Sequence, residues 1–177
     1  MSKQLRNWEL AGAVFTAAAG TLLHFMFAWS GNSSVAAVAS AVNESTWEHM
    51  KLLFMPAFLF TLVQFFAMGH SYPNFTAVRG VSVLAGTALI PVLFYTYTGS
   101  LGYNIIWVDI VIFFVADFFL FRLDYALLRR GSLSSLGWQI IGVILLWGML
   151  FLFIRYTFAP PHLNLWKDPV TGGYGIP

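Results

Sequence analysis

The residues best suited to chemistry lie in one short polar segment, Asn43 to Lys51, with the sequence NESTWEHMK. It places two carboxylates, Glu44 and Glu48, beside His49 in a chain in which only 9% of the residues are charged. Two histidines and one carboxylate with an open position form a ligand set of catalytic zinc, and zinc lowers the pKa of its bound water to about 7. A second histidine at the same depth would complete this set.

His24 is the candidate for that second histidine. Gly12, Thr16, Gly20 and His24 recur every four residues and form a stripe of small residues that ends in a histidine. Small residues at this spacing let two membrane helices approach closely. The stripe is therefore predicted to face protein, and His24 to face the same way. A hydrogen-bonded structural histidine would fit the same pattern, so the sequence leaves both roles open.

Two further carboxylates, Asp109 and Asp117, lie in the apolar segment IIWVDIVIFFVADFFLFRLDY. An ionised carboxylate at the centre of a membrane costs about 2.5–3.5 kcal/mol on insertion scales, so such groups are functional candidates. Eight residues apart, they lie about 80° apart around a helix and about 12 Å apart along it, too far to share one small ion. Asp109 is predicted to meet His24 and His49 near the surface. Asp117 lies deeper and is a candidate proton relay.

Structural roles compete with each of these assignments. Ser45 and Glu48 have the spacing of a capping box, in which each side chain bonds the backbone N–H of the other residue. Lys51 is expected to extend to the lipid head groups. Asp109 could pair with Arg155 or Lys51, and Asp117 could bond an amide such as that of Gln64.

The composition indicates which elements must position these groups. The chain has 177 residues, of which 59% are hydrophobic, with 18 Phe, 7 Trp and 7 Tyr against 9 Lys and Arg and 7 Asp and Glu. A soluble domain has about a quarter of its residues charged, whereas this chain has only 9%, too few to cover the surface of a soluble domain. The absence of Cys excludes disulfides, thiolate ligands and a thiol nucleophile. The sequence also lacks a Gly-x-Ser-x-Gly elbow, a phosphate-binding loop and a basic cluster suited to nucleic acid.

Long apolar runs predict an all-α polytopic membrane protein, because about 20 apolar residues in a helix cross the hydrocarbon layer. We expect one domain, residues 1–159, to form a bundle of five transmembrane helices. The predicted spans are residues 8–29, 48–69, 78–98, 103–123 and 136–158. The tail, residues 160–177, is rich in Pro and Gly and is expected to be ordered, extended and folded over the outer face of the bundle.

The distribution of Lys and Arg predicts the orientation. With five spans, one side of the membrane receives six of these residues, namely Lys3, Arg6, Arg79, Arg122, Arg129 and Arg130. The other side receives Lys51, Arg155 and Lys167. Cytoplasmic segments carry the excess of positive charge. We therefore expect a multi-pass protein of the bacterial inner membrane with a cytoplasmic N-terminus and an outer C-terminus.

A resemblance adds to this interpretation. The segment Asn43-Glu44-Ser45-x-Trp47-Glu48-His49-x-Lys51-Leu52-x-Phe54-x-Pro56, together with the tail PPHLNLWKDPVTGGYGI, resembles a family of small uncharacterised bacterial membrane proteins over nearly the whole chain. That family implies no activity. The order Asn-Glu-Ser, Trp and His is more faintly similar to the alkaline ceramidases and the progestin- and adiponectin-receptor-like proteins. Those proteins have seven spans and a zinc site of three histidines, whereas this chain has five predicted spans and no paired histidines in the last one.

The preferred hypothesis is a divalent-metal-dependent membrane hydrolase that acts on a lipid or lipid-linked substrate. Its candidate metal ligands, for zinc, are His24, His49, Glu48 and Asp109, and its candidate catalytic carboxylates are Glu44, Glu48 and Asp109. One alternative is a proton- or cation-coupled transporter or channel component that uses Asp117. Another is a non-catalytic subunit or scaffold of a membrane complex. The expected partners are the lipid bilayer, a lipid-like substrate or other membrane proteins, and not nucleic acid.

Overall fold

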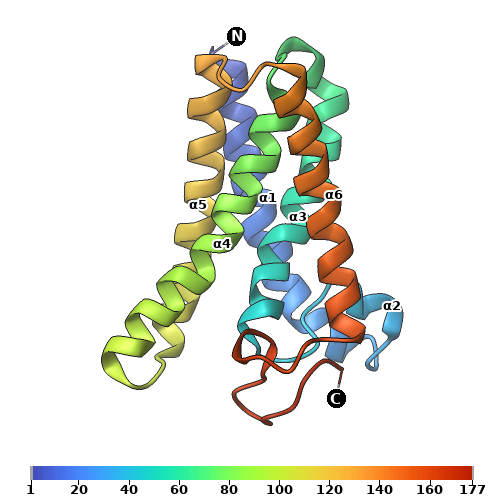
Figure 1. Ribbon diagram of the computed structural model, residues 1–177, viewed down its shortest axis with the longest axis vertical. Helices are drawn as coiled ribbons and strands as arrows, with labels where there is room; N and C mark the ends of the chain where they lie inside the picture. Colours follow the sequence, from blue (N-terminus) through green and yellow to red (C-terminus); the bar gives the residue numbers. More distant parts are fainter. Residues whose placement is uncertain (1, 177) are drawn as a thin grey trace.

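The helices of the protein are arranged side by side in a computed structural model that describes residues 2–176 (Figure 1). Within these residues there are six α-helices: α1 (Ser2–Trp29), α2 (Ser34–Ala37), α3 (Thr46–Met68), α4 (Phe75–Leu101), α5 (Ile106–Arg130) and α6 (Leu136–Phe158). Two short 3-10 helices, η1 (Gly69–Ser71) and η2 (Asn164–Trp166), follow α3 and α6. The all-α prediction is confirmed, but the predicted number of five helices is not.

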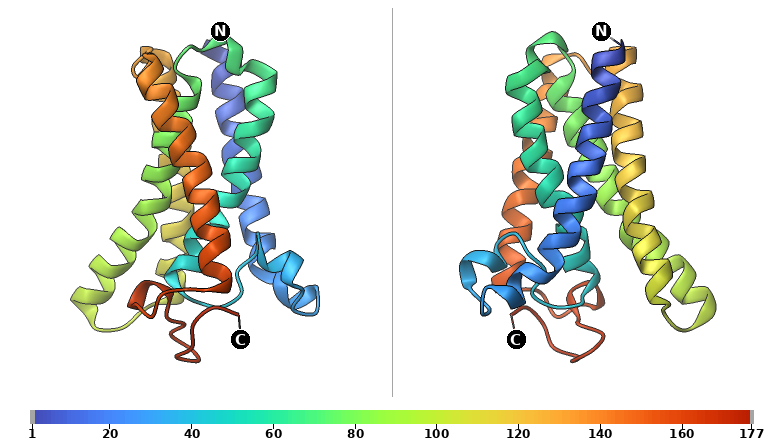
Figure 2. Two further views of the ribbon diagram at one scale, coloured as in Figure 1. Left: turned by 45° about the vertical axis from the view of Figure 1, so that its right-hand side comes forward. Right: turned by 180° about the vertical axis from the view of Figure 1, so that it is seen from behind.

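The two ends of the bundle carry different segments. The N-terminus lies at one end with η1 and the α5–α6 connection, whereas α2 and the C-terminal tail lie at the other (Figure 1). At the tail end, the α4–α5 connection and α2 stand on opposite sides of the molecule in every view (Figure 2). We refer to these as the N-terminal end and the tail end.

Four helical segments of the described residues are long and apolar enough to cross a membrane. They are Lys3–Trp29, Thr46–Ser71, Phe75–Leu101 and Leu136–Phe158. α5 has a similar length, 25 residues, but it is interrupted by charged side chains. These include Asp109, Asp117, Arg122 and Asp124. By length and composition the chain therefore has four candidate spans, not the five predicted.

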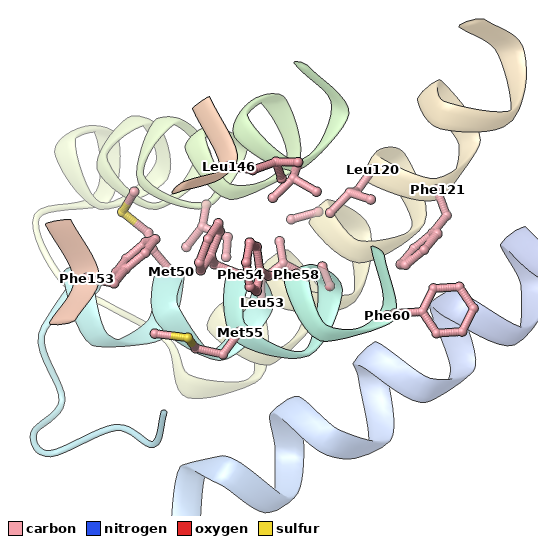
Figure 3. Packing of buried hydrophobic residues seen from close by; sticks show 14 of the residues in the cluster. Met50, Leu53, Phe54, Met55, Phe58, Phe60, Leu120, Phe121, Leu146 and Phe153 are labelled. Carbon is pink, nitrogen blue, oxygen red and sulfur yellow. The ribbon is translucent and has the colours of Figure 1, made fainter. Parts of the chain in front are cut away.

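α3 is the central helix of the bundle. In the most apolar stretch of its span 67% of the residues are buried, against 17% for α6. Figure 3 shows Phe54 and Phe58 of α3 packed near Leu120 of α5 and Leu146 of α6. The Phe54 ring lies 4.9 Å from the ring of Phe153. A helix that is apolar on all sides is buried in protein or in lipid, and neighbouring helices cover most of α3.

The stripe of small residues on α1 faces protein, as predicted. Gly12, Thr16 and Gly20 are buried. A Cβ atom on Gly20 would lie 2.7 Å from the carbonyl oxygen of Leu52, so α1 and α3 pack closely there. This contact lies one turn before His24 and brings that histidine close to the start of α3.

The tail packs against the start of α3. The Trp166 ring lies 5.0 Å from that of Trp47 and 5.4 Å from that of Tyr156. The Asn43 side chain donates a hydrogen bond from Nδ2 to the carbonyl oxygen of Gly175, at 2.8 Å. The tail is thus tied to the segment that holds the candidate site.

Lys51 differs from its prediction, because it is fully buried. Its Nζ pairs with Glu48 at 2.5 Å. It also donates to the carbonyl oxygen of Ala37 at 2.9 Å and to Thr157 Oγ1 at 2.8 Å. Lys51 finds three oxygen partners inside the protein, so it does not extend to the lipid head groups.

Three other charged residues are also buried. The exposed fractions of Glu9, Asp124 and Arg79 are 4%, 0% and 0%, although Arg79 was counted among the positive charges on one side of the membrane. α4 begins at Phe75, which places Arg79 one turn inside the helix. There Arg79 pairs with both carboxylates, which removes all three charges from the surface.

Candidate metal centre

Three side chains of types that can bind a metal meet at the tail end of the bundle. They are His24 on α1, Glu44 in the loop before α3 and His49 in the first turn of α3. One ligand atom from each lies within 4.8 Å of the other two. Glu44 Oε2 is 3.9 Å from His24 Nε2 and 3.6 Å from His49 Nε2. The two imidazole rings are 5.5 Å apart.

The start of α3 fixes the orientation of His49. Ser45 is the N-cap residue, and its side chain accepts from the backbone N–H of Glu48. His49 Nδ1 lies 3.0 Å from the carbonyl oxygen of Ser45. Because a carbonyl can only accept, Nδ1 carries the hydrogen, and the lone pair of the neutral ring is on Nε2. Metal-binding histidines are held in this way by a hydrogen bond from the other ring nitrogen.

Asn43 fixes the backbone on both sides of Glu44. Its Oδ1 accepts from the N–H of Ser45 at 2.9 Å, while its Nδ2 donates to Gly175 in the tail. The Glu44 side chain itself is 47% exposed, and each of the two histidine side chains is 33% exposed. The site is therefore anchored by the tail yet open to a ligand from outside.

His24 is held by packing. Its ring stacks on Phe25 at 5.0 Å, and its Nδ1 is buried without a protein partner. Its Nε2 faces Glu44. His24 can therefore bind a metal through Nε2 without breaking a hydrogen bond of the protein.

The spacing of the three ligands fits a small divalent cation. Bonds of about 2.0–2.1 Å in a tetrahedral arrangement place ligand atoms about 3.3 Å apart. The observed carboxylate to imidazole distances of 3.9 and 3.6 Å exceed this value slightly. All three ligand atoms lie within 4.8 Å of one another, so a tetrahedral site requires these side chains to move closer together. Two imidazoles and a carboxylate suit zinc, among other transition metals.

Two of the predicted ligands lie outside this group. Glu48 points away from His49 and accepts from Lys51 and from the backbone N–H of Val42. Asp109 accepts from the hydroxyl of Tyr97 and from the side-chain amide of Asn104. The structure brings together His24 and His49 as predicted, with Glu44 in place of Glu48 and Asp109.

Asp117 is buried in α5, with an exposed fraction of 4%, and its Oδ1 has no protein partner. Gln64, its suggested partner, donates instead to Glu9 at 2.6 Å. Asp117 belongs neither to the candidate metal site nor to a salt bridge among the described residues.

Sequence reasoning missed the cluster of Glu9, Gln64, Arg79 and Asp124 at the other end of the bundle. A signal was present, because Asp117 and Asp124 are seven residues apart and so share one face of α5. Glu9 and Thr16 share one face of α1 in the same way. Such a repeat indicates a polar face directed at other helices.

Comparison with known proteins identifies a family but no activity. The model of the Family of unknown function (DUF6512) matches residues 1–176, almost the entire chain. No curated protein and no solved structure matches the chain, and no relationship to the alkaline ceramidases is shown. The predicted membership of an uncharacterised family is thus confirmed, and the chain belongs to the DUF6512 family of unknown function.

Proposed function

We propose that this membrane protein binds a divalent metal, zinc by preference, through His24, Glu44 and His49 and hydrolyses a lipid or lipid-linked substrate there. The observation that carries the proposal is the convergence of three ligand atoms, from separate segments, within 4.8 Å. When bound, such a metal supplies an activated water and polarises a carbonyl or phosphoryl oxygen. The chain's own residues hold the ligands in place and leave one side open.

The surroundings of His24 favour a lipid-like substrate. Phe25, which stacks on His24, is 48% exposed, and Trp29 next to it is 70% exposed. Aromatic side chains of this kind lie at the boundary between lipid and water. A substrate whose chain remains in the bilayer could therefore reach the site sideways, past these two rings.

Glu44 is the carboxylate that faces both histidines of this site. Glu48 is compensated by Lys51, and Asp109 is engaged by Tyr97 and Asn104, so neither is free to act as a base near His49. We assign His24, His49 and Glu44 as the ligands. Asn43, which fixes the backbone around Glu44, is a positioning residue.

We further propose that α5 also crosses the membrane. α4 ends at the tail end and α6 begins at the N-terminal end, so the chain must return along α5 (Figure 1). Its buried charge at Asp124 is paired with Arg79, which lowers the cost of burial.

The burial of Arg79 and Lys51 changes the count of surface charges. Without these two residues, five Lys and Arg residues remain toward the N-terminal end: Lys3, Arg6, Arg122, Arg129 and Arg130. Two remain at the tail end, Arg155 and Lys167. The excess still favours a cytoplasmic N-terminus and an outer metal site.

Metal content of the purified full-length protein tests the site. We expect one zinc per chain by elemental analysis. The substitutions His24→Ala, His49→Ala and Glu44→Ala should each lower zinc affinity by at least about tenfold. This is the lower end of the loss caused by removing residues that only support metal ligands, and removal of a ligand itself should cost no less. Affinity should also fall as the pH is lowered, because a ligating imidazole must be neutral.

Two control substitutions separate this site from general effects. His70→Ala removes an exposed histidine at the opposite end, and Asp109→Asn removes a carboxylate outside the group. Both should bind zinc as the native chain does. Equal losses in the controls, or no zinc binding by the native chain, would refute the metal site.

Hydrolysis is tested separately with a long-chain acyl ester in mixed micelles. The zinc-loaded protein should release fatty acid, and both a chelator and His49→Ala should abolish the release. Zinc binding without hydrolysis of acyl esters or of a lipid-linked pyrophosphate would retain the metal site and refute the hydrolase.

A second candidate function is proton or cation movement through the bundle, favoured by the unpartnered carboxyl group of Asp117. The close contacts of α1 with α5 are those of Gly12 with Phe121 and of Gly20 with Phe113. Thr16 is midway between Gly12 and Gly20 in the sequence, and Asp117 is midway between Phe113 and Phe121. Thr16 therefore lies level with Asp117. The hydroxyl group of Thr16 is also buried without a protein partner. Proteoliposomes loaded with a pH-sensitive dye should show proton uptake that Asp117→Asn abolishes. Uptake unchanged by this substitution would exclude the relay.

A further inference from the structure

A second cluster of polar side chains is buried near the N-terminal end, where four helices contribute to it. Arg79 Nη1 of α4 lies 2.5 Å from Asp124 Oδ2 of α5 and 3.5 Å from Glu9 Oε2 of α1. Gln64 of α3 donates from Nε2 to Glu9 Oε1 at 2.6 Å. Arg79 Nε donates to Thr61 Oγ1 at 3.0 Å. These side chains are at most 4% exposed.

The charges of this cluster do not balance. Two ionised carboxylates and one guanidinium leave a net charge of one negative unit inside the protein. The described part of α6 carries a single charged residue, Arg155, at its opposite end. Lys3 and Arg6 of α1 and Arg122 of α5 are exposed. An uncompensated buried charge is so costly that the group takes up a proton instead.

We propose that the cluster is a proton-binding site, in which Glu9 carries one proton that it exchanges with water at the N-terminal end. Asp124 stays ionised because it is the closer partner of Arg79, at 2.5 Å against 3.5 Å for Glu9. Both carboxylates face the same nitrogen, Arg79 Nη1. This inference does not depend on the metal site.

Gln64 can accommodate both states of Glu9. As placed, its Nε2 donates toward Glu9 and its Oε1 is buried without a partner. The nitrogen and oxygen of an amide are distinguished only by their hydrogen bonds. A half-turn of the amide lets Oε1 accept from the O–H of protonated Glu9. The same side chain thus donates to the carboxylate and accepts from the acid.

A surface pocket comes within one helical turn of the cluster. A pocket of about 400 Å³ opens at the N-terminal end and is lined by Leu5, Tyr72 and Leu128, among others. Leu5 lies one turn from Glu9, and Leu128 lies one turn from Asp124. Burial raises the pKa of Tyr72, whose side chain lines this pocket. Tyr72 and Tyr125 are titratable groups that pack against the apolar group containing Leu5 and Leu128.

Infrared spectroscopy of the purified full-length protein tests the inference. The parent protein for these measurements carries the substitution Asp117→Asn, so that the carboxyl group of Asp117 does not contribute to the spectrum. At neutral pH the parent should show the C=O stretching band of one protonated carboxylic acid. The band should shift when glutamate is labelled with ¹³C and remain when aspartate is labelled, a readout that needs no further substitution.

Substitutions then assign the band to one residue. Glu9→Gln should remove the band, whereas Glu44→Gln, which changes an exposed glutamate, should retain it. Raising the pH should remove the band reversibly in the parent as Glu9 releases its proton to water. Each of these results supports a proton on Glu9.

Three results would overturn the proposal. Absence of the band from the parent at every pH at which it is folded would mean that both carboxylates are ionised. The band could shift with ¹³C-aspartate, which would place the proton on Asp124. It could also emerge only after sodium is removed, in which case a sodium ion and not a proton balances the charge.

Discussion

Loss of the ammonium group of Lys51 is expected to destabilise the protein strongly, because this group lies at the centre of a buried network. Its partners are Glu48 at 2.5 Å, the carbonyl oxygen of Ala37 and the hydroxyl of Thr157. Glu48 is only 2% exposed, so Lys51→Met leaves its carboxylate without a counter-charge. Lys51 connects α3 with the end of α2 and with α6, and the substitution loosens all three.

The magnitude follows from the burial of both groups. Removal of one partner from a buried ion pair costs roughly 3–5 kcal/mol. For a chain of this size, roughly 2–4 °C per kcal/mol gives a fall in Tm of roughly 6–20 °C. Thermal unfolding of the detergent-purified protein measures it. The matched control is Lys167→Met, which removes an exposed lysine of the tail and should change stability by less than about 0.5 kcal/mol.

The double substitution Glu48→Gln with Lys51→Met completes the test. It removes both charges, so its stability should exceed that of Lys51→Met alone. If Lys51→Met unfolds at the same temperature as Lys167→Met, the buried pair does not contribute as argued. The stability lost in the double variant is compared with the sum of the losses in Glu48→Gln and Lys51→Met. If the two values are equal, the two side chains are not coupled, and the account of the network is refuted.

Three further predictions concern packing, the tail and orientation. Gly142→Ala should cost roughly 1–3 kcal/mol, because its Cβ would overlap the carbonyl oxygen of Thr76, whereas Gly137→Ala, with no atom within 4 Å, should be tolerated when both are compared by thermal unfolding. Trp166→Ala should expose the tail to limited proteolysis, since it removes the contact with Trp47, while Val170→Ala, at an exposed side chain, should leave the cleavage rate unchanged. In this chain without cysteine, Gly172→Cys should react with an impermeant thiol reagent from outside intact cells, and labelling only after lysis would reverse the proposed orientation.

The start of α3 shows how far local sequence rules reach. The predicted cap is present, since the side chain of Ser45 accepts from the N–H of Glu48. The reciprocal bond is absent, because Asn43 bonds the N–H of Ser45 and Glu48 turns to Lys51 and Val42. A capping rule considers one turn of helix. It does not anticipate a lysine one turn further that offers the carboxylate a stronger, buried partner.

The carboxylate of the candidate site could not be chosen from the sequence for a similar reason. Depth alone places Asp109 level with His24 and His49, and this was the basis of the prediction. In the structure α5 begins beside the end of α4, on the side opposite α2, and there Tyr97 binds Asp109 (Figures 1 and 2). Depth along the bundle follows from helix length, but position around it depends on long-range packing.

The buried charges near the N-terminal end illustrate the same limit. A lone arginine near a span boundary is most simply assigned to a loop, because its burial without partners is costly. The partners of Arg79 are Glu9, 70 residues earlier, and Asp124, 45 residues later. Only the arrangement of α1, α4 and α5 shows that they meet.

One face of α1 connects the two polar ends of the molecule. Glu9, Thr16 and His24 lie on the same face as the glycines that allow α1 to pack closely on α3 and α5. At the N-terminal end this face delivers Glu9 to the buried cluster for which we propose a balancing proton. At the tail end it delivers His24 to a half-exposed group that an external ligand can enter. Because the same close packing sets both positions, the small residues of α1 position the polar groups at each end and do not serve helix association alone.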